Sequence, residues 1–319
     1  MPHFCDPKKL RIALFYDIGE VSEGTDTNSP GAFNMQPDAR TAKSLQIVEG
    51  IVAMIGDQTD EAKGSEVFRR WLKYQQAFWR YSWNNTILMA VQAQQYGITL
   101  SNVAGSTKWN SLNRKVKGEE WNRRLWILAP IFKTVADKAT GKDKSILAGF
   151  RSVYVFDHSQ TEGEEAPTLE YRAKGDDAGL VAALENVYRD NGITLEYRHP
   201  VLMDALYGGA KGVSMGKTVH VSSALQGAEK AGTLAHELAH SLMHFRENNT
   251  LDLDHSRSTA EIEAESVAAC VLGAWGLDSQ PSSLYIACWG GDSKKIRDSM
   301  TRIAGTSKTI LSAILPAEK

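Results

Sequence analysis

The sequence predicts an α+β protein, in which a small N-terminal α+β domain is followed by a mainly helical domain with a short sheet. The chain has 319 residues, which is long for one domain and enough for two, each with its own core. Apolar residues at helical spacing dominate its second half, and two segments rich in Val, Ile and Phe flank a turn in its first half. A hydrophobic content of 42% and a charged content of 23% exclude a wholly disordered, collagen-like or coiled-coil chain.

Composition divides the chain into four regions. The segment from Glu20 to Asn34 is rich in Gly, Ser, Thr and Asn and shows little periodicity, which indicates a mobile arm. A stretch with clustered Gly and Glu around Pro167 indicates a linker. We therefore predict a mobile arm with a leading helix in residues 1–60, a first domain in 61–160, a linker in 161–175 and a second domain in 176–319.

Helical periodicity predicts helices before residue 100, and a hairpin follows them. Ser82 can cap the last of these helices, because its hydroxyl can accept a hydrogen bond from a free backbone N–H, and Gly97 can end it. Lys, Gly and Asp residues between the two β-rich segments predict the turn of the hairpin. The predicted helices are Asp38–Ile55, Ser65–Arg80 and Trp83–Tyr96, and the predicted strands are Trp126–Val135 and Ile146–Phe156.

The second half is expected to begin with a helix and a strand and to end with helices. A glycine-rich segment, Gly208–Gly216, predicts a turn before a second short strand. No internal repeat is visible. The predicted elements are a helix near Asp177–Asp190, strands at Ile193–Arg198 and Lys217–Ser222, and helices at about 226–245, 258–276 and 292–314.

Charge is segregated along the chain, although the net charge is only −2 at pH 7. No Asp or Glu occurs in the 52 residues from Val67 to Gly118, which contain eight Lys and Arg residues. Six of the eight tryptophans lie between Trp71 and Trp126. Single-stranded nucleic acid is held in basic grooves where its bases stack on aromatic side chains. The segment therefore predicts a nucleic-acid surface, and the alternative is a solvated basic face.

Aromatic residues near the ends of elements are better candidates for contact with bases than aromatic residues at helical spacing. Trp71 lies among apolar residues at helical spacing and is expected in the core. Tyr81, Trp83 and Trp109 lie near predicted element ends, beside polar and basic residues. The residues predicted to bind nucleic acid are Arg80, Tyr81, Trp83, Asn84, Asn85, Lys108, Trp109, Arg114, Lys115, Lys117, Arg123 and Arg124.

The run His236-Glu237-Leu238-Ala239-His240 is an HExxH sequence inside a predicted helix. Residues four apart project from one face of a helix, so both imidazoles can bind one tetrahedral Zn²⁺. Glu237 lies beside the metal, where it can take a proton from water and pass it to a leaving amine. The flanking residues are small or apolar, which indicates a packed helix on which unpaired charged side chains would be costly. The alternative is a surface helix with coincidental histidines.

A tetrahedral site needs a third protein ligand, and the next predicted helix offers carboxylates. A metzincin would carry Gly and His where this chain has Met243 and Arg246, so that class is excluded. Glu261 and Glu265 share one helix face by the same spacing rule. We predict Glu261 as the ligand and Glu265 as acceptor of a hydrogen bond from a ligand imidazole, the reverse assignment being the alternative. Glu263 is expected to face solvent.

Two further histidines lie near the motif. His244 is two turns from His236 along the helix, about 12 Å of rise, which is too far to share one tetrahedral ion easily. We therefore predict a structural role for His244. His220, in the strand before the motif, is expected to be a residue of the pleat, and the edge of that strand can alternatively accept an extended peptide.

Cysteine usage and hydropathy indicate the compartment. The chain has only Cys5, Cys270 and Cys288, whose wide spacing excludes a disulfide framework and a CxxC zinc site. No segment approaches the ~18 consecutive apolar residues of a membrane helix. The apolar segment Leu10–Ile18 is interrupted by charged residues and lacks a cleavage site. We therefore expect a cytoplasmic protein without membrane contact.

These motifs in combination resemble ArdC-type antirestriction proteins, over roughly residues 65–315. The HExxH helix with the following carboxylates resembles the zincin-like metallopeptidase domain of that family, which is also similar to ImmA/IrrE-type peptidases. The other segments that carry the resemblance are Tyr81–Leu88, Trp109, Leu112–Glu119, Ile127–Pro130, Val155–Gly163, Glu261–Glu265 and Tyr285–Trp289.

The resemblance implies a single-stranded-DNA-binding N-terminal domain joined to a zinc peptidase fold. It implies a role in protecting incoming DNA, for a protein carried by plasmids or integrative elements. In this chain, His236, His240 and Glu261 would hold Zn²⁺ and Glu237 would act as general base. We predict that Tyr285 helps to stabilise the oxyanion.

The sequence leaves several functions open. The first is a zinc metallopeptidase with a single-stranded-DNA-binding domain, acting as an antirestriction or DNA-protection factor on an unidentified protein or peptide substrate. The second is a DNA-protecting binding protein whose metal domain is not proteolytic, although a purely structural zinc does not need a glutamate at position 237. The third is an ImmA/IrrE-like protease that cleaves a repressor.

Overall fold

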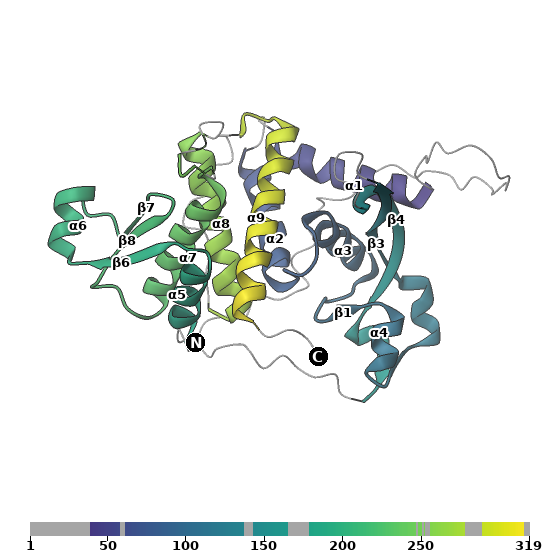
Figure 1. Cartoon of the computed structure of the whole chain (residues 1–319). Helices are drawn as coiled ribbons and strands as arrows, with labels where there is room; N and C mark the ends of the chain where they lie inside the picture. The colour runs from purple at the N-terminus through teal and green to yellow at the C-terminus, as the bar shows by residue number, and fades with distance from the viewer. Residues whose placement is uncertain are drawn as a thin grey trace.

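Helices gather in the middle of the molecule, with a small sheet at one end and a long hairpin at the other (Figure 1). This mixture of helices and small sheets confirms the predicted α+β fold class. Within the described residues, no helix is long and apolar enough to span a bilayer. The predicted arm lies outside them. The computed structural model describes residues 39–57, 61–136, 143–164, 179–246, 248–250, 252, 256–277 and 289–315.

The first half consists of helices followed by short strands and a long hairpin. Its elements are α1 (Ala39–Ile55), α2 (Glu61–Ala77), α3 (Trp83–Tyr96), β1 (Val103–Ala104), α4 (Ser106–Ser111), β2 (Arg114–Val116), β3 (Leu125–Ala136), β4 (Asp143–Asp157) and β5 (Thr161–Gly163), with 3₁₀ turns at Gly118–Arg123 and His158–Gln160. The predicted bounds of α3 are confirmed, because the Ser82 hydroxyl accepts the Asn85 N–H and Gly97 is left-handed with a φ of 65°. Helix α2 begins and ends earlier than predicted.

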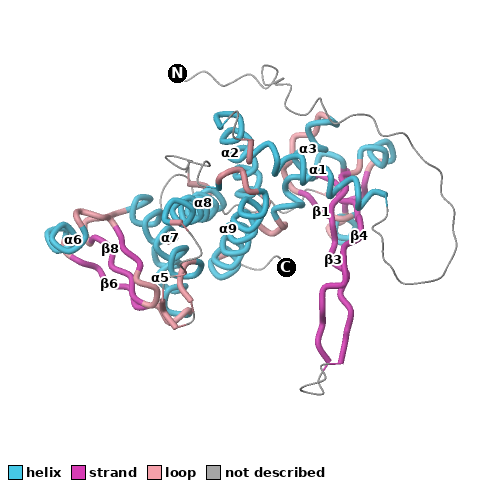
Figure 2. Tube along the Cα trace, turned by 90° about the horizontal axis from the view of Figure 1, so that it is seen from above, coloured by secondary structure: helices cyan, strands magenta, loops and turns pink. Residues whose placement is uncertain are grey.

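The hairpin organises the sheets of this half. Strands β1, β4 and β3 pair antiparallel in that order, and β2 pairs with β5. The β3–β4 hairpin extends well beyond the helices (Figure 2). Because residues 161–163 form β5 and pair with β2, the predicted start of the linker at residue 161 is wrong. The rest of the predicted linker, 165–175, lies outside the described residues.

The second half combines a small mixed sheet with long helices. Its elements are α5 (Leu180–Asp190), β6 (Thr194–Arg198), α6 (Pro200–Tyr207), β7 (Gly212–Ser214), β8 (Thr218–Ser222), α7 (Gly227–Met243), α8 (Arg257–Trp275) and α9 (Ser293–Ile314). Strand β8 lies between β6, which is parallel to it, and the antiparallel edge strand β7. Helix α6 and strand β7 were not predicted. Gly208 and Gly216, with φ of 61° and 77°, do form turns, but the residues between them include a strand.

One continuous core joins the two halves of the chain. It contains fully buried side chains from α1, α2, α7, α8 and α9, among them Val52, Phe68, Leu234, Val267 and Ile303. Helix α9 packs beside α8 and also contacts α1 and α3 (Figure 1). The first three helices therefore share the core of the second half, instead of the separate core expected from the length. A smaller cluster lies under the hairpin and contains Phe78, Met89, Leu125, Ile127 and Val155.

Two amide side chains of α3 pair with the backbone of β3. Asn85 Nδ2 donates to the Leu128 carbonyl at 2.9 Å, and its Oδ1 accepts from the Leu128 N–H at 2.8 Å. Gln92, two turns later, makes the same pair of hydrogen bonds with Trp126. Strand β3 is at the edge of its sheet, where N–H and C=O groups lack a neighbouring strand. Helix α3 therefore supplies the partners that another strand would otherwise supply.

We expect Asn85→Ala to lower the free energy of unfolding by roughly 2–4 kcal/mol, because it leaves both backbone groups of Leu128 buried without partners. Asn84→Ala is the matched control, since the Oδ1 of Asn84 accepts no hydrogen bond from the described residues. Urea unfolding followed by circular dichroism measures both variants. Equal losses of stability in the two variants would contradict this role of Asn85.

Candidate functional site

Helix α7 presents both histidines of the HExxH sequence on one face. Its opposite face carries Leu234, Ala235, Leu238 and Ala239, all fully buried in the core, and this packing fixes the rotation of the helix about its axis. His236 and His240 then project toward α8, and their side chains are 20% and 15% exposed. Their rings meet edge to face, with centroids 4.7 Å apart and an angle of 69° between their planes.

The carboxylate of Glu261 comes to this face from α8. Ser256 caps α8, because its Oγ accepts a hydrogen bond from the Thr259 N–H, so that Glu261 lies in the first turns of the helix. Its Oε2 lies 3.4 Å from His236 Nε2 and 3.7 Å from His240 Nε2. The structure thus brings together the side chains that the sequence predicted as metal ligands.

The distances among these atoms fit a tetrahedral ion. Ligands held 2.0–2.1 Å from a tetrahedral metal are about 3.3 Å from each other. The two imidazole Nε2 atoms are 3.0 Å apart, and each is 3.4–3.7 Å from the Glu261 oxygen. Within the described residues, His236, His240 and Glu261 are the group found with this arrangement of ligand atoms. Two imidazoles and one carboxylate leave a fourth position for water or substrate, as in catalytic zinc sites.

Glu237 lies beside these ligands and is 6% exposed. Burial raises the pKa of Glu237 to about 7, although the neighbouring His236 and a hydrogen bond from the Ser214 N–H oppose this shift. Strand β7 approaches Glu237 closely, because Gly212 has no side chain: a Cβ there would lie 2.7 Å from Glu237 Cγ. A buried carboxyl with such a pKa can both accept and release a proton near neutral pH.

The charges of the site depend on one another. The neighbouring imidazoles of His236 and His240 lower the pKa of Glu261 well below its usual range. Burial lowers the pKa of His240. Burial alone would also lower the pKa of His236, but the hydrogen bond to Glu261 and the charges of Glu237, Glu261 and Glu265 outweigh burial and raise it. Glu261 and His236 therefore stabilise each other's charged forms, whereas burial favours the neutral form of His240.

The predicted exposure of Glu263 is wrong. This residue was expected to face solvent, but its side chain is fully buried and contacts Arg302 and Ser299 from α9 and His244 from α7. Helix α8 lies between α7 and α9. Because α9 covers the side of α8 on which Glu263 lies, this carboxylate is buried instead of facing solvent. His244, which was predicted to be structural, is 3% exposed and makes a hydrogen bond to His240.

The remaining residues predicted near the centre have separate environments. Glu265 is half-buried and acts on His236 through its charge, and the hydrogen bond predicted for it is not among those of the described residues. His220 lies in β8 and, as expected, is a residue of the pleat; its Nδ1 is 2.7 Å from the hydroxyl of Tyr207 at the end of α6. Tyr285 lies outside the described residues.

Some residues predicted to contact nucleic acid are internal, so these predictions are wrong. Trp83 is 8% exposed and donates its indole N–H to Thr301 in α9, and Trp109 is 2% exposed and donates to the Phe156 carbonyl. Asn85 pairs with β3, as described above. Arg114 is 6% exposed and holds β5 through Thr161. Their polar atoms have partners inside the protein, which is why these residues can be buried at element ends.

The other predicted residues are at least partly accessible. Arg80 lies over the ring of Trp79, and the half-buried Tyr81 donates its hydroxyl to the Val103 carbonyl. Lys117 donates to the Ser159 carbonyl. The predicted residues that are half-buried or exposed are Arg80, Tyr81, Asn84, Lys108, Lys115, Lys117, Arg123 and Arg124.

The structure adds an aromatic face that the sequence prediction missed. We define it as Trp121, Trp126, Phe132, Phe150 and Tyr154, which lie on one face of the β3–β4 hairpin or beside it. Trp121, Phe150 and Tyr154 are 37–40% exposed, and Phe132 is 61% exposed. The first turn of α1 crosses this face. The available signal was the apolar run Leu125–Phe132, because it is uninterrupted although successive residues of a strand point to opposite faces and the core covers only one of them.

Cations surround the aromatic face. The guanidinium groups of Arg40 and Arg124 lie 4.7 and 5.0 Å from the ring centre of Trp126. Lys133 and Arg151 are exposed on the opposite face of the same hairpin, so the cations on the aromatic face itself are those next to Trp126. The face therefore combines exposed rings with positive charge.

Comparison with known proteins finds similarity to solved structures. No protein-family profile and no curated protein sequence matches this chain. Two crystal structures of the antirestriction protein ArdC from plasmid R388 match, one metal-free and one bound to Mn(II), with 17% and 16% identity. Each match covers 75% of this chain. It covers 87% of the metal-free ArdC chain, with a TM-score of 0.45, and 90% of the Mn(II)-bound ArdC chain, with a TM-score of 0.41. Because both TM-scores are below 0.5, we take residue roles from the geometry of this chain.

We expect Gly212→Ala to lower the free energy of unfolding by roughly 1–3 kcal/mol, because the new methyl group would overlap Glu237 and Thr233. Gly232→Ala in α7 is the control: its Cβ would lie 3.8 Å from Leu272, an ordinary contact, and alanine favours the helix. Denaturant unfolding measures both. The combination of Gly212→Ala with Glu237→Ala should recover part of the loss. A Gly212→Ala protein as stable as the wild type would show that β7 does not hold Glu237 in place.

Proposed function

We propose that this chain is a zinc-dependent metallopeptidase whose first half binds single-stranded DNA. The observation that carries the peptidase proposal is the convergence of His236, His240 and Glu261 at the spacing of a tetrahedral site, with Glu237 beside them. Zinc fits this donor set, because two imidazoles and a carboxylate with an open fourth position are typical of catalytic zinc. A structural site would need four protein ligands and no adjacent acid.

The residues divide the reaction between them. When bound, the metal would supply Lewis-acid chemistry that polarises a peptide carbonyl and makes water more acidic. Glu237 takes a proton from the attacking water and passes it to the amine that leaves. The Ser214 N–H, which donates to the Glu237 carboxylate, and the backbone at Gly212 keep this carboxylate next to the ligands. Water is the nucleophile, so the bond that breaks is the peptide C–N bond.

The aromatic face supports the second activity. Bases of single-stranded DNA stack on exposed rings, while their phosphates are attracted to nearby cations. Trp121 and Tyr154 are exposed and in contact with each other, and Arg124 lies over the adjacent Trp126. No stacking of this kind is open to Trp83 or Trp109, because their rings are buried. The proposed DNA surface is therefore the aromatic face together with the accessible cations around it.

We propose DNA protection, as in antirestriction proteins, as the biological role of the two activities. The combination of sequence motifs supports this role. Two other roles remain as alternatives: protection of DNA by binding alone, with a metal domain that does not cleave, and cleavage of a repressor by an ImmA/IrrE-like protease. Glu237 distinguishes them, since only a hydrolytic role requires its carboxylate.

We expect purified wild-type protein to bind about one equivalent of Zn²⁺, and His240→Ala to lose it, because two ligands cannot close the site. Glu237→Gln is the control: it should keep the zinc and abolish hydrolysis of the protein substrate. Metal analysis and competition with a chelator measure binding. Zinc content in His240→Ala equal to that of the wild type would place the metal elsewhere.

Protection of DNA against a restriction enzyme that survives Glu237→Gln unchanged would favour protection by binding alone.

We expect Trp121→Ala and Tyr154→Ala each to weaken binding of a single-stranded oligonucleotide by ~1–3 kcal/mol, about 5- to 150-fold, through lost stacking. Tyr197→Ala is the matched control, because Tyr197 is also 39% exposed but lies on β6. Fluorescence anisotropy over a series of salt concentrations measures affinity, whose logarithm should fall with log salt by ~0.7 per neutralised phosphate. An affinity that does not change with salt concentration would exclude the aromatic face as the binding surface. Equal losses of affinity in Tyr154→Ala and Tyr197→Ala would exclude it as well.

A further inference from the structure

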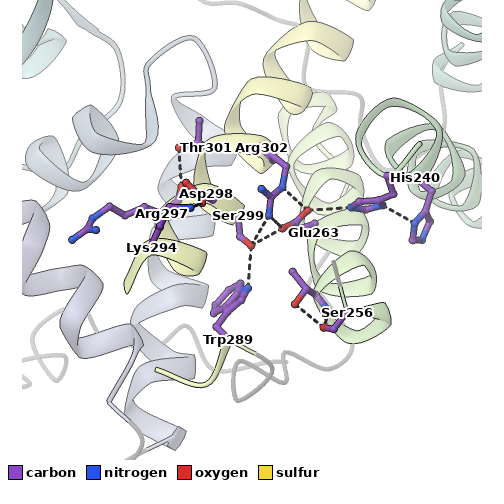
Figure 3. Close-up of polar contacts among 12 residues, drawn as sticks. His240, Ser256, Glu263, Trp289, Lys294, Arg297, Asp298, Ser299, Thr301 and Arg302 are labelled. Carbon is purple, nitrogen blue, oxygen red and sulfur yellow. Dashed lines mark hydrogen bonds and ion pairs between the residues drawn. The ribbon is translucent and has the colours of Figure 1, made fainter. Parts of the chain in front are cut away.

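A buried chain of hydrogen bonds leads away from the proposed metal centre behind His240. His240 Nδ1 lies 2.9 Å from Nδ1 of His244, and His244 Nε2 lies 3.1 Å from Oε2 of Glu263. Glu263 in turn receives hydrogen bonds from Arg302 and Ser299 of α9 (Figure 3). His244 and Glu263 are 3% and 0% exposed, so bulk water does not compete for these contacts. The chain therefore joins three helices through one side of the metal centre.

Glu263 determines which atoms donate and which accept in this series of hydrogen bonds. The Arg302 guanidinium reaches both carboxylate oxygens, through Nε at 3.0 Å and through a second nitrogen at 2.5 Å, which keeps the carboxylate ionised. An ionised carboxylate only accepts hydrogen bonds. The nitrogen of His244 that faces it must therefore carry a proton, so in the neutral ring His244 is protonated on Nε2 and bare on Nδ1.

The protonation of His244 in turn determines which nitrogen of His240 carries a proton. Two imidazole nitrogens 2.9 Å apart share one proton, and Nδ1 of His244 is bare, so His240 carries the proton on its own Nδ1. Its Nε2 is then bare. This is the nitrogen that lies 3.0 Å from His236 Nε2 and 3.7 Å from Glu261. The reverse direction would place a bare nitrogen of His244 against the Glu263 carboxylate and a proton on the nitrogen of His240 that has to bind the metal.

We propose that His244 and Glu263 are positioning residues that preset the tautomer and orientation of His240 for metal binding. The proposal rests on the proposed function, since it assumes a metal on His240 Nε2. Partners of this kind fix ligand rings and raise their basicity, and their loss typically weakens metal binding 10- to 100-fold. Here the carboxylate acts through a second histidine, four residues after the ligand on the same helix. The ring centroids of His240 and His244 are 5.0 Å apart.

The first test measures zinc affinity of the full-length chain by competition with a chelator. His244→Leu should bind zinc 10- to 100-fold more weakly than the wild type, because nothing then fixes the Nδ1 proton of His240. His244→Asn should restore most of the affinity, since its Oδ1 can accept that proton near the place of the imidazole Nδ1. His220→Leu is the matched control: His220 is also buried, at 8% exposed, but its partner is Tyr207. Wild-type affinity in a folded His244→Leu protein would overturn the proposal.

The second test measures the wild-type protein itself. Nitrogen NMR of the metal-free, ¹⁵N-histidine-labelled wild type reports which ring nitrogen carries each proton, with His244→Asn used to assign the signals. We expect the proton on Nδ1 of His240 and on Nε2 of His244. A His240 protonated on Nε2 in the metal-free chain would overturn the proposal even if His244→Leu fails to fold. If the wild type binds no zinc at all, the proposed function fails instead, and the tautomers still show whether the chain of hydrogen bonds presets His240.

Discussion

The metal centre depends on how helices α7 and α8 pack against each other. Two of its ligands come from one helix and the third from the other, so a rotation of either helix by one residue would move a ligand out of reach. Leu234, Ala235, Leu238 and Ala239 fix the rotation of α7, since all are fully buried. The Ser256 cap fixes where α8 begins and hence where Glu261 lies. Apolar packing and one cap therefore determine the position of polar atoms to within the tolerance of a coordination shell.

A second constraint comes from the charge buried between these helices and α9. An ionised carboxylate inside a protein is stable only when it is paired and hydrogen-bonded. Glu263 meets this condition through Arg302 and Ser299, both of which belong to α9. The same helix accepts the Trp83 indole N–H at Thr301, and Lys308 donates to the Arg80 carbonyl. Helix α9 therefore holds both the polar surroundings of His240 and the start of α3, which explains why the two halves share one core.

Sequence reasoning succeeded where the chemistry is local. Both histidines of the HExxH sequence and the cap of α3 follow from spacing within one helix, which does not depend on the rest of the fold. Glu263 was misplaced because its burial depends on α9, a helix that begins 30 residues later in the chain. An arginine in that last helix could have suggested a buried partner, but spacing alone does not show which carboxylate it reaches.

Local sequence also does not show which aromatic residues are buried. Trp83 and Trp109 lie near element ends beside polar residues, and the same surroundings are compatible with exposure and with burial. What decided between them was a distant acceptor for each indole N–H, Thr301 for one and the Phe156 carbonyl for the other. Tyr154, by contrast, is exposed because it points to the face of β4 opposite its neighbours Val153 and Val155, which pack into the cluster under the hairpin. Exposure of an aromatic residue is thus a property of tertiary structure, which composition along the chain cannot give.

The arrangement of the two proposed sites limits how they can influence each other. The centre lies between α7 and α8, and the aromatic face lies on the hairpin at the other end of the molecule, with α9 between them in both views (Figures 1 and 2). Each helix layer is about 10 Å across, and charges in water are screened over about 8–10 Å at physiological salt. The charge of a DNA strand on the aromatic face therefore has little direct effect on the ligands. An influence of DNA on the centre would pass through the helices that join the two halves, among them α9, whose Arg302 holds the carboxylate behind His240.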